Sequence, residues 1–274
     1  MTMTDEHQSD EPSGALHPDP LPRVRQIAKD APWEWLAAGW RDMWRSSSLS
    51  LAYGLAFAVI SSLLTLAITA LDLSSLVLTL AAGFILLGPI LAVGLYEISR
   101  RLEAGEPIRM KEIFLVRTRA PAQLMFLGVC LMIAFLIWVR VATLLFALFY
   151  GMQGFPPLAQ FVNDLLFTAR GLALLSIGSV IGGFLALGVF AISAVSVPLL
   201  MVRNVDAVSA MLLSIEAVRK NLVPMILWAW LIALMMGFGI ATLFGGLVIT
   251  FPLIGHATWH AFRAVVDTDS DDQI

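Results

Sequence analysis

The sequence predicts an all-α polytopic membrane protein, built as a bundle of six transmembrane helices. Of its 274 residues 59% are hydrophobic and only 14% are charged, and the mean hydropathy is +0.85. Soluble domains carry about 25% charged residues, so most side chains here must face lipid. Runs such as Leu76–Leu87 and Leu124–Val139 are apolar on every side. This favours helices, because membrane strands alternate polar and apolar residues.

Six apolar runs are long enough to cross a hydrocarbon core that needs about 20 residues per helix. The expected spans are Leu49–Leu71, Leu76–Ile98, Ala122–Phe149, Gly171–Val202, Leu222–Leu243 and Leu247–Phe262. Residues 31–265 therefore form the membrane domain, and the acidic tails at 1–30 and 266–274 are expected to be disordered. No signal peptide is recognisable in residues 1–22. Leu158–Phe167, between the third and fourth spans, is expected to form a short surface helix.

The positive charges predict the orientation. Of the 17 lysines and arginines, all except Arg140 and Arg170 fall before the first span, after the sixth, or in the loops after the second and fourth. Positively charged segments next to spans stay in the cytoplasm. Both termini are therefore expected to be cytoplasmic.

An internal threefold repeat is indicated by the prolines of the even-numbered spans. Eight residues after each proline stands an ionisable side chain, which gives the pairs Pro89 and Glu97, Pro198 and Asp206, and Pro252 and His260. Each odd-numbered span follows a segment with amphipathic character: Trp33–Trp44, Lys111–Arg119 and Met211–Lys220. The predicted unit is an interfacial helix followed by a hairpin. Alternatively, the prolines coincide by chance, and the amphipathic segments are the ends of tilted spans.

Small residues four apart occur in two spans. Gly178 and Gly182 lie in the fourth, and Gly237, Ala241 and Gly245 lie in the fifth. Such spacing lets helix backbones approach closely. It predicts ordinary packing within the bundle, with a homodimer face as the alternative.

Arg140 is the most costly residue of the predicted spans, since a central arginine costs roughly 2.5–3.5 kcal/mol on insertion scales. We expect it to pair with Asp164 or Asn163 in the outer loop, or alternatively to bind an anion or a lipid. His256 and His260 lie four apart on one helix face, a spacing that suits a metal. Only Glu97 and Asp206 could complete such a site, so we expect no metal and no cofactor.

No catalytic residues are identified. The sequence lacks the common motifs of metalloproteases, serine hydrolases and phosphate-binding loops, and Cys130 is its only cysteine. We therefore expect no enzymatic activity and no nucleic-acid partner. The expected partners are the lipid bilayer and a membrane protein, or a second copy of the chain.

Three segments of the sequence resemble a known protein family: Trp33–Trp44, Gly88–Glu97 and Arg100–Pro107. With them, residues 30 to 265 resemble bacterial integral membrane proteins grouped as domain of unknown function 2189. The resemblance implies a helical fold and a bacterial inner membrane, without any residue-level role. Some members are labelled as cytochrome c oxidase subunits. A catalytic oxidase subunit would need several intramembrane histidines, which this sequence lacks.

Two functions remain in view. The first is a non-enzymatic accessory, assembly or scaffold protein that binds membrane partners or lipid. The second is a small transporter or channel that uses Arg140 or the set Glu97, Asp206 and His260. A polar cavity at mid-membrane lined by these residues would favour transport, whereas a dry bundle would favour the first function.

Overall fold

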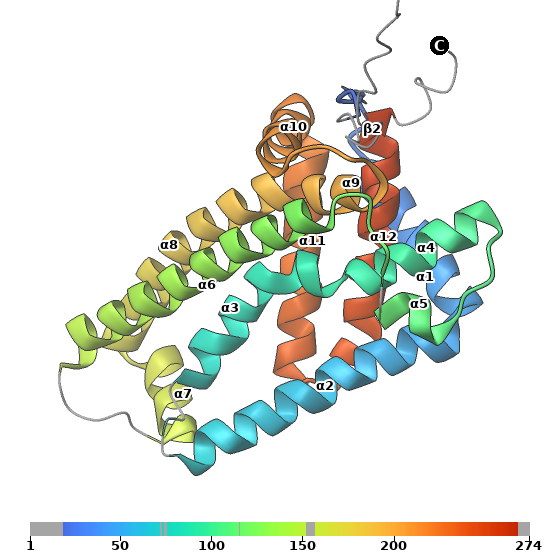
Figure 1. Ribbon diagram of the computed structural model, residues 1–274. Coiled ribbons are helices and arrows are strands. Elements are labelled where there is room, and N and C mark those ends of the chain that lie inside the picture. Colours follow the sequence, from blue (N-terminus) through green and yellow to red (C-terminus); the bar gives the residue numbers. More distant parts are fainter. Residues whose placement is uncertain (1–18, 72, 74–75, 115, 152–156, 268–274) are drawn as a thin grey trace, which may run out of the picture.

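The computed structural model describes residues 19–71, 73, 76–114, 116–151 and 157–267. The outer parts of the two expected tails, residues 1–18 and 268–274, lie outside this range. Within it the chain is helical except for connections and one pair of two-residue strands (Figure 1). The predicted all-α membrane bundle is confirmed.

Twelve helices and two strands follow one another in the part of the chain that is described. The helices are α1 (Ala31–Arg45), α2 (Ser47–Ala70), α3 (Leu76–Leu91), α4 (Val93–Ala104), α5 (Met110–Phe114), α6 (Pro121–Tyr150), α7 (Leu158–Phe167), α8 (Ala169–Ser193), α9 (Ser196–Val202), α10 (Ala207–Lys220), α11 (Leu222–Ala241) and α12 (Leu247–Val265). The strands are β1 (Arg23–Val24) and β2 (Val266–Asp267). The helix predicted at Leu158–Phe167 is α7, and its position on the membrane surface stays a prediction.

Five helical stretches of the described chain are long and apolar enough to cross a membrane: Ser47–Ala70, Leu76–Ala104, Pro121–Tyr150, Ala169–Val202 and Leu222–Ala241. They correspond to the first five predicted spans. The sixth predicted span is α12, which contains His256, His260 and Arg263 and is less apolar than the others. Length and composition therefore support five spans, and the count of six stays a prediction.

Helix α12 is less apolar because protein, and not lipid, surrounds most of it. It packs against α1, α2, α4 and α11, and most of its side chains are buried. Two glycines allow close approach: a Cβ on Gly39 of α1 would lie 2.6 Å from the Ala257 backbone nitrogen, and one on Gly54 of α2 would lie 2.4 Å from the Val248 carbonyl oxygen. A helix enclosed in this way does not need an apolar surface on every side.

The close packing within the bundle predicted for Gly178 of α8 and Gly237 of α11 is wrong, whereas a homodimer face there stays a prediction. A Cβ added to Gly178 or to Gly237 would meet nothing within 4 Å. Gly182 alone among the three packs tightly, against the ring of Trp138. The spacing of small residues along a helix shows that they share one face. It does not show whether that face contacts another helix.

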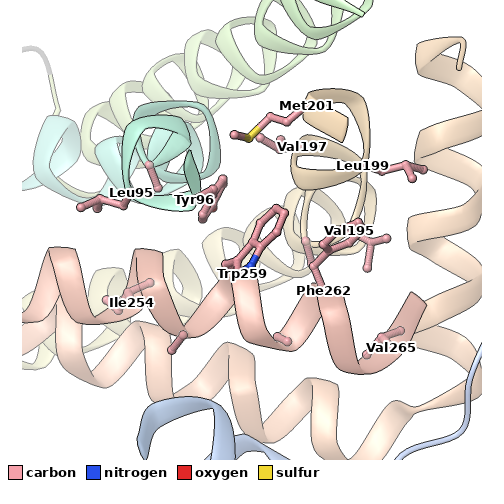
Figure 2. Packing of buried hydrophobic residues seen from close by; sticks show 14 of the residues in the cluster. Leu95, Tyr96, Val195, Val197, Leu199, Met201, Ile254, Trp259, Phe262 and Val265 are labelled. Carbon is pink, nitrogen blue, oxygen red and sulfur yellow. The ribbon is translucent and has the colours of Figure 1, made fainter. Parts of the chain in front are cut away.

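The main hydrophobic core joins α4, α9, α10 and α12 and extends to Val24 of β1 and Val266 of β2. Figure 2 shows Trp259 and Phe262 of α12 between Tyr96 on one side and Val195 on the other. All four side chains are almost completely buried. This core fixes the end of α12 that carries the histidines.

The two ends of the described chain meet. Strand β1 pairs antiparallel with β2, and Arg25 forms an ion pair with Asp267. The Asn221 side chain, at the α10–α11 junction, accepts a hydrogen bond from the Ile27 backbone and donates one to the Arg25 carbonyl. Residues 19–30, expected to belong to a disordered tail, therefore follow a defined path in the structure.

The order of elements recurs three times. A short helix, a long helix and a proline-containing helical stretch follow one another as α1–α2–α3/α4, α5–α6–α8/α9 and α10–α11–α12, with α7 inserted in the second unit. The amphipathic segment of the second unit was predicted over Lys111–Arg119, but among its described residues the helix covers only Met110–Phe114. The order agrees with the predicted repeat, and superposition of the three units stays a prediction.

Candidate functional site

A buried network of polar side chains lies where α1, α2, α4 and α12 meet. We call it the Asp42–His256 network; its members are Asp42, Ser46, Ser50, Ser99, His256 and His260. All except His260 are less than a tenth exposed. It forms because α1 packs so closely on α12 at Gly39 that the next turn of α1 brings Asp42 beside the histidines.

The hydrogen bonds around His256 determine its tautomer. Ser99 Oγ donates to Asp42 Oδ2 over 2.8 Å, so it must accept from His256 Nδ1, which lies 2.8 Å away. A neutral His256 then accepts at Nε2, and Ser50 Oγ lies 2.9 Å from that atom. The ring therefore connects a hydroxyl of α2 to a hydroxyl of α4.

Asp42 receives a second hydrogen bond at the same oxygen. His260 Nε2 lies 2.7 Å from Asp42 Oδ2. Burial raises the pKa of the Asp42 carboxyl, but the hydrogen bonds from His260 and Ser99 outweigh burial and lower the pKa below its ordinary value. Asp42 is therefore an ionised acceptor at neutral pH.

The network contains a serine, a histidine and a carboxylate, as hydrolase sites do, but its arrangement differs. In a catalytic triad one histidine contacts both the carboxylate and the serine. Here His260 contacts Asp42, whereas His256, which contacts Ser50 and Ser99, is separated from Asp42 by Ser99. Ser50, the hydroxyl opposite, is 0% exposed, and neither of the two cavities described below is lined by it. The network links α1, α2, α4 and α12 to one another through hydrogen bonds.

Glu97 and Asp206 belong to other clusters. Glu97 Oε1 and Oε2 accept hydrogen bonds of 2.6–2.9 Å from Arg100 and Arg101 on its own helix. Asp206 caps the N-terminus of α10, where it accepts from the Ser209 backbone. Hydrogen bonds with the side chain and then the backbone of Ser209 lower its pKa. The predicted set Glu97, Asp206 and His260 is thus divided among three separate groups of partners.

Arg140 lies exposed on α6. Within the described ranges it forms no ion pair or hydrogen bond with Asp164 or Asn163, so the predicted pair is not formed. Exposure in the middle of an apolar helix leaves the alternative role, contact with an anion or a lipid, as a prediction.

The histidine spacing does not produce a metal site in the residues that the structure describes. No group of three or more His, Cys, Asp or Glu side chains converges there. His256 and His260 are brought together as predicted, but each is bound by hydrogen bonds to side chains of other helices.

An apolar cavity of about 350 Å³ lies among α3, α8, α11 and α12. Its wall includes Pro89 of α3, Gly183 of α8, Trp228 of α11 and Phe251 of α12. A second, wider hollow of about 700 Å³ lies between α6 and the α3–α5 region, with Tyr53 of α2 at its edge. None of Arg140, Glu97, Asp206, His256 and His260 lines either one.

Sequence reasoning missed several residues of these sites. Asp42, Ser50 and Ser99 belong to no recognisable sequence motif. Asp42 also follows Arg41 in a segment whose composition is typical of an exposed, charged helix surface. One signal was available: Asp42 lies seven residues after Trp35 and three after Gly39, on the face of α1 opposite to Trp33, Trp40 and Trp44. Trp228 looked like one of many apolar residues of its span.

Residues 76–201 match the family model described as predicted integral membrane protein (DUF2189). This segment runs from α3 to α9 and contains Glu97, Ser99 and Arg140. Neither the curated proteins nor the solved structures provide a match.

Proposed function

Because residues 76–201 match the DUF2189 model of predicted integral membrane proteins, we propose a non-enzymatic role for the protein in the membrane. It is an accessory, assembly or scaffold component of a bacterial inner membrane and binds a membrane partner or lipid. Its termini are cytoplasmic.

One observation supports this proposal over transport: the cavity that enters the bundle is apolar. The ionisable residues that could carry an ion are held in clusters elsewhere, with Glu97 bound to Arg100 and Asp42 bound to His260. An apolar cavity stays dry and offers an ion no hydrogen-bonding path.

The arrangement of the charged elements supports the orientation. Strand β1 contacts both α10 and β2, and α4 contacts both α1 and α5. These elements carry eight of the 17 lysines and arginines, so basic segments that are far apart in the sequence contact one another. Segments rich in positive charge remain in the cytoplasm.

The exposed face of α1 supports contact with the membrane surface. Trp33, Trp40 and Trp44 are 55%, 45% and 50% exposed, while Trp35 on the other face is buried. Tryptophan is enriched at the level of the lipid headgroups. Helix α1 thus packs on α12 with one face and presents indole rings with the other.

A small transporter or channel is the second candidate. The break between α3 and α4 at Ala92 borders the cavity, and Gly88 and Pro89 line it. Interrupted helices border the substrate path in many transporters.

Reconstitution separates the two candidates. Purified protein in liposomes is tested for proton and anion flux as wild type and as Arg140→Ala, with Arg170→Ala as the matched control. Our proposal predicts no flux above that of empty liposomes for any of the three. It also predicts that a membrane protein co-purifies in a fixed ratio from mild detergent. Flux that disappears only in Arg140→Ala would refute the accessory role.

A further inference from the structure

The apolar cavity is open on the side that faces the lipid. Its floor is made of almost fully buried side chains, among them Tyr96, Trp228 and Phe251. Its rim is made of exposed residues, Gly183 and Leu187 on α8 and others on the facing helix α11. A molecule dissolved in the bilayer can therefore enter between α8 and α11 without crossing a polar region.

Trp228, a residue of the cavity floor, carries a buried polar atom that has no hydrogen-bond partner among the described residues. Trp228 is 1% exposed, and its indole Nε1 forms no hydrogen bond with any described residue. Its ring meets Trp35 of α1 edge to face, with centroids 5.8 Å apart. A buried N–H group without an acceptor costs about 1–3 kcal/mol, so such groups are rarely left unpaired. The cavity is the place from which an acceptor could come.

The height of Trp228 in the bundle fits the carbonyl groups of a lipid. It lies six residues after Leu222, where α11 begins, about 9 Å along the helix axis, and Lys220 ends the preceding helix α10. Lysine at a helix end extends to the headgroup layer, which is about 5–8 Å thick on each side of the hydrocarbon. Trp228 therefore lies just inside the hydrocarbon, close to the level of the glycerol ester bonds.

The size of the cavity limits what can occupy it. A volume of about 350 Å³ lies within the usual range for small-ligand sites, about 300–1,000 Å³. A helix of a partner protein, about 10–12 Å across with its side chains, is too wide. Along α8 the lining runs from Ser179 to Ala194, about 22 Å at the rise of an α-helix. The space is long, narrow and apolar, as an acyl chain is.

We propose that this cavity binds one acyl chain of a membrane glycerophospholipid, and that Trp228 Nε1 donates a hydrogen bond to its ester carbonyl. The inference deepens the proposed function, on which it rests, because it names the ligand class. It also gives a role to Gly183 of α8, which has open space beside it and keeps the entrance free.

The test uses phospholipid with brominated acyl chains, because bromine quenches nearby indole fluorescence. The full-length protein is placed in nanodiscs of phosphatidylethanolamine and phosphatidylglycerol, with or without bromine. The emission of Trp228 is obtained as the difference between each protein and its Trp228→Phe counterpart. Because Trp228 is buried behind the rim, strong quenching requires a chain inside the cavity.

Gly183→Leu fills the entrance, and Gly178→Leu is its matched control. Both glycines lie on α8 with nothing within 4 Å of an added Cβ, but only Gly183 lines the cavity. We expect Trp228 to be quenched in the wild type and in Gly178→Leu and to be protected in Gly183→Leu. Unquenched Trp228 in the wild type, or equal quenching in both variants, would overturn the proposal.

The amount of phospholipid that stays bound during purification is a second measurement of binding at the same site. Native mass spectrometry of the detergent-purified protein should show one retained phospholipid in the wild type and in Gly178→Leu, and none in Gly183→Leu. Removal of the donor in Trp228→Phe should weaken retention by up to about tenfold. Retention of a different apolar molecule, or of none, would refute a phospholipid ligand. Either failure leaves the flux and co-purification results unchanged, so it is distinguishable from failure of the accessory role.

Discussion

His260 Nε2 of α12 lies 2.7 Å from Asp42 Oδ2 of α1, so the last helix of the bundle is bound to the first through one carboxylate. The two residues are 218 positions apart in sequence. Helix α1 is therefore more than an amphipathic helix on the membrane surface. Its inner face belongs to the core, while its outer face keeps the exposed tryptophans.

Replacing Asp42 by Asn should destabilise the protein. The uncharged amide leaves the hydrogen bonds from Ser99 and His260 without their ionised acceptor, and bonds to charged groups contribute about 1.5–3 kcal/mol. The thermal midpoint in mild detergent should fall accordingly. Glu34→Gln, on the exposed side of the same helix, is the control and should change stability by less than about 0.5 kcal/mol. Equal midpoints for the two variants would contradict a structural role of the network.

The contribution of Asp42 should depend on pH in one direction only. Its pKa in the folded protein lies below the ordinary value of 3.8, so the unfolded state binds the proton more readily. The stability that it contributes is therefore present above pH 3.8 and is lost as the pH falls through the folded value. We expect the stability gap between the wild type and Asp42→Asn to be constant from neutral pH to about pH 5 and to close in stronger acid. A gap that closes near pH 6.5 instead would show that a histidine controls the network.

Replacing Gly39 by Ala should separate α1 from α12. The new Cβ would lie 2.6 Å from the Ala257 backbone nitrogen, and backbone atoms cannot move aside as a flexible side chain does. Overpacking of this kind costs typically 1–3 kcal/mol. Gly178→Ala is the control, since open space surrounds that position and alanine is the better helix former. The thermal midpoint should fall for Gly39→Ala and should stay level or rise for Gly178→Ala.

The fold could be predicted largely from the sequence because lipid imposes a simple rule on it. Every side chain that faces hydrocarbon must be apolar, so the runs around Leu124–Val139 and Leu222–Leu243 identify α6 and α11 directly. Helix α12 is an exception to this rule. Protein encloses it, and its sequence therefore contains histidines and an arginine that lipid would not tolerate.

The candidate site could be predicted only in part. The spacing of His256 and His260 correctly predicted that both lie on one helix face. The same spacing occurs in metal sites, although the sequence offered too few further ligands to predict a metal here. The actual partners of the two histidines, Asp42, Ser50 and Ser99, come from three other helices. No periodicity along one helix reveals which residues of another helix it will meet, because that depends on packing at points such as Gly39.

Helix α12 should cross the membrane, despite its composition. Strand β1 pairs with β2, so the chain segments before the first span and after α12 lie on one side, and this requires an even number of crossings. Five apolar stretches are already long enough to span, and α12 supplies the sixth. Leu243, in the turn before α12, is 84% exposed and should lie on the opposite side from Lys29.

Cysteine labelling in intact cells tests this. In a background with Cys130→Ser, an impermeant maleimide should label Leu243→Cys from outside and should label Lys29→Cys only after the membrane is opened. Both substitutions are at exposed positions, so the fold should tolerate them. Labelling of both from outside, or of neither, would mean that α11 and α12 do not form a transmembrane hairpin. The proposed position of Trp228 near the inner lipid carbonyls would then be wrong as well.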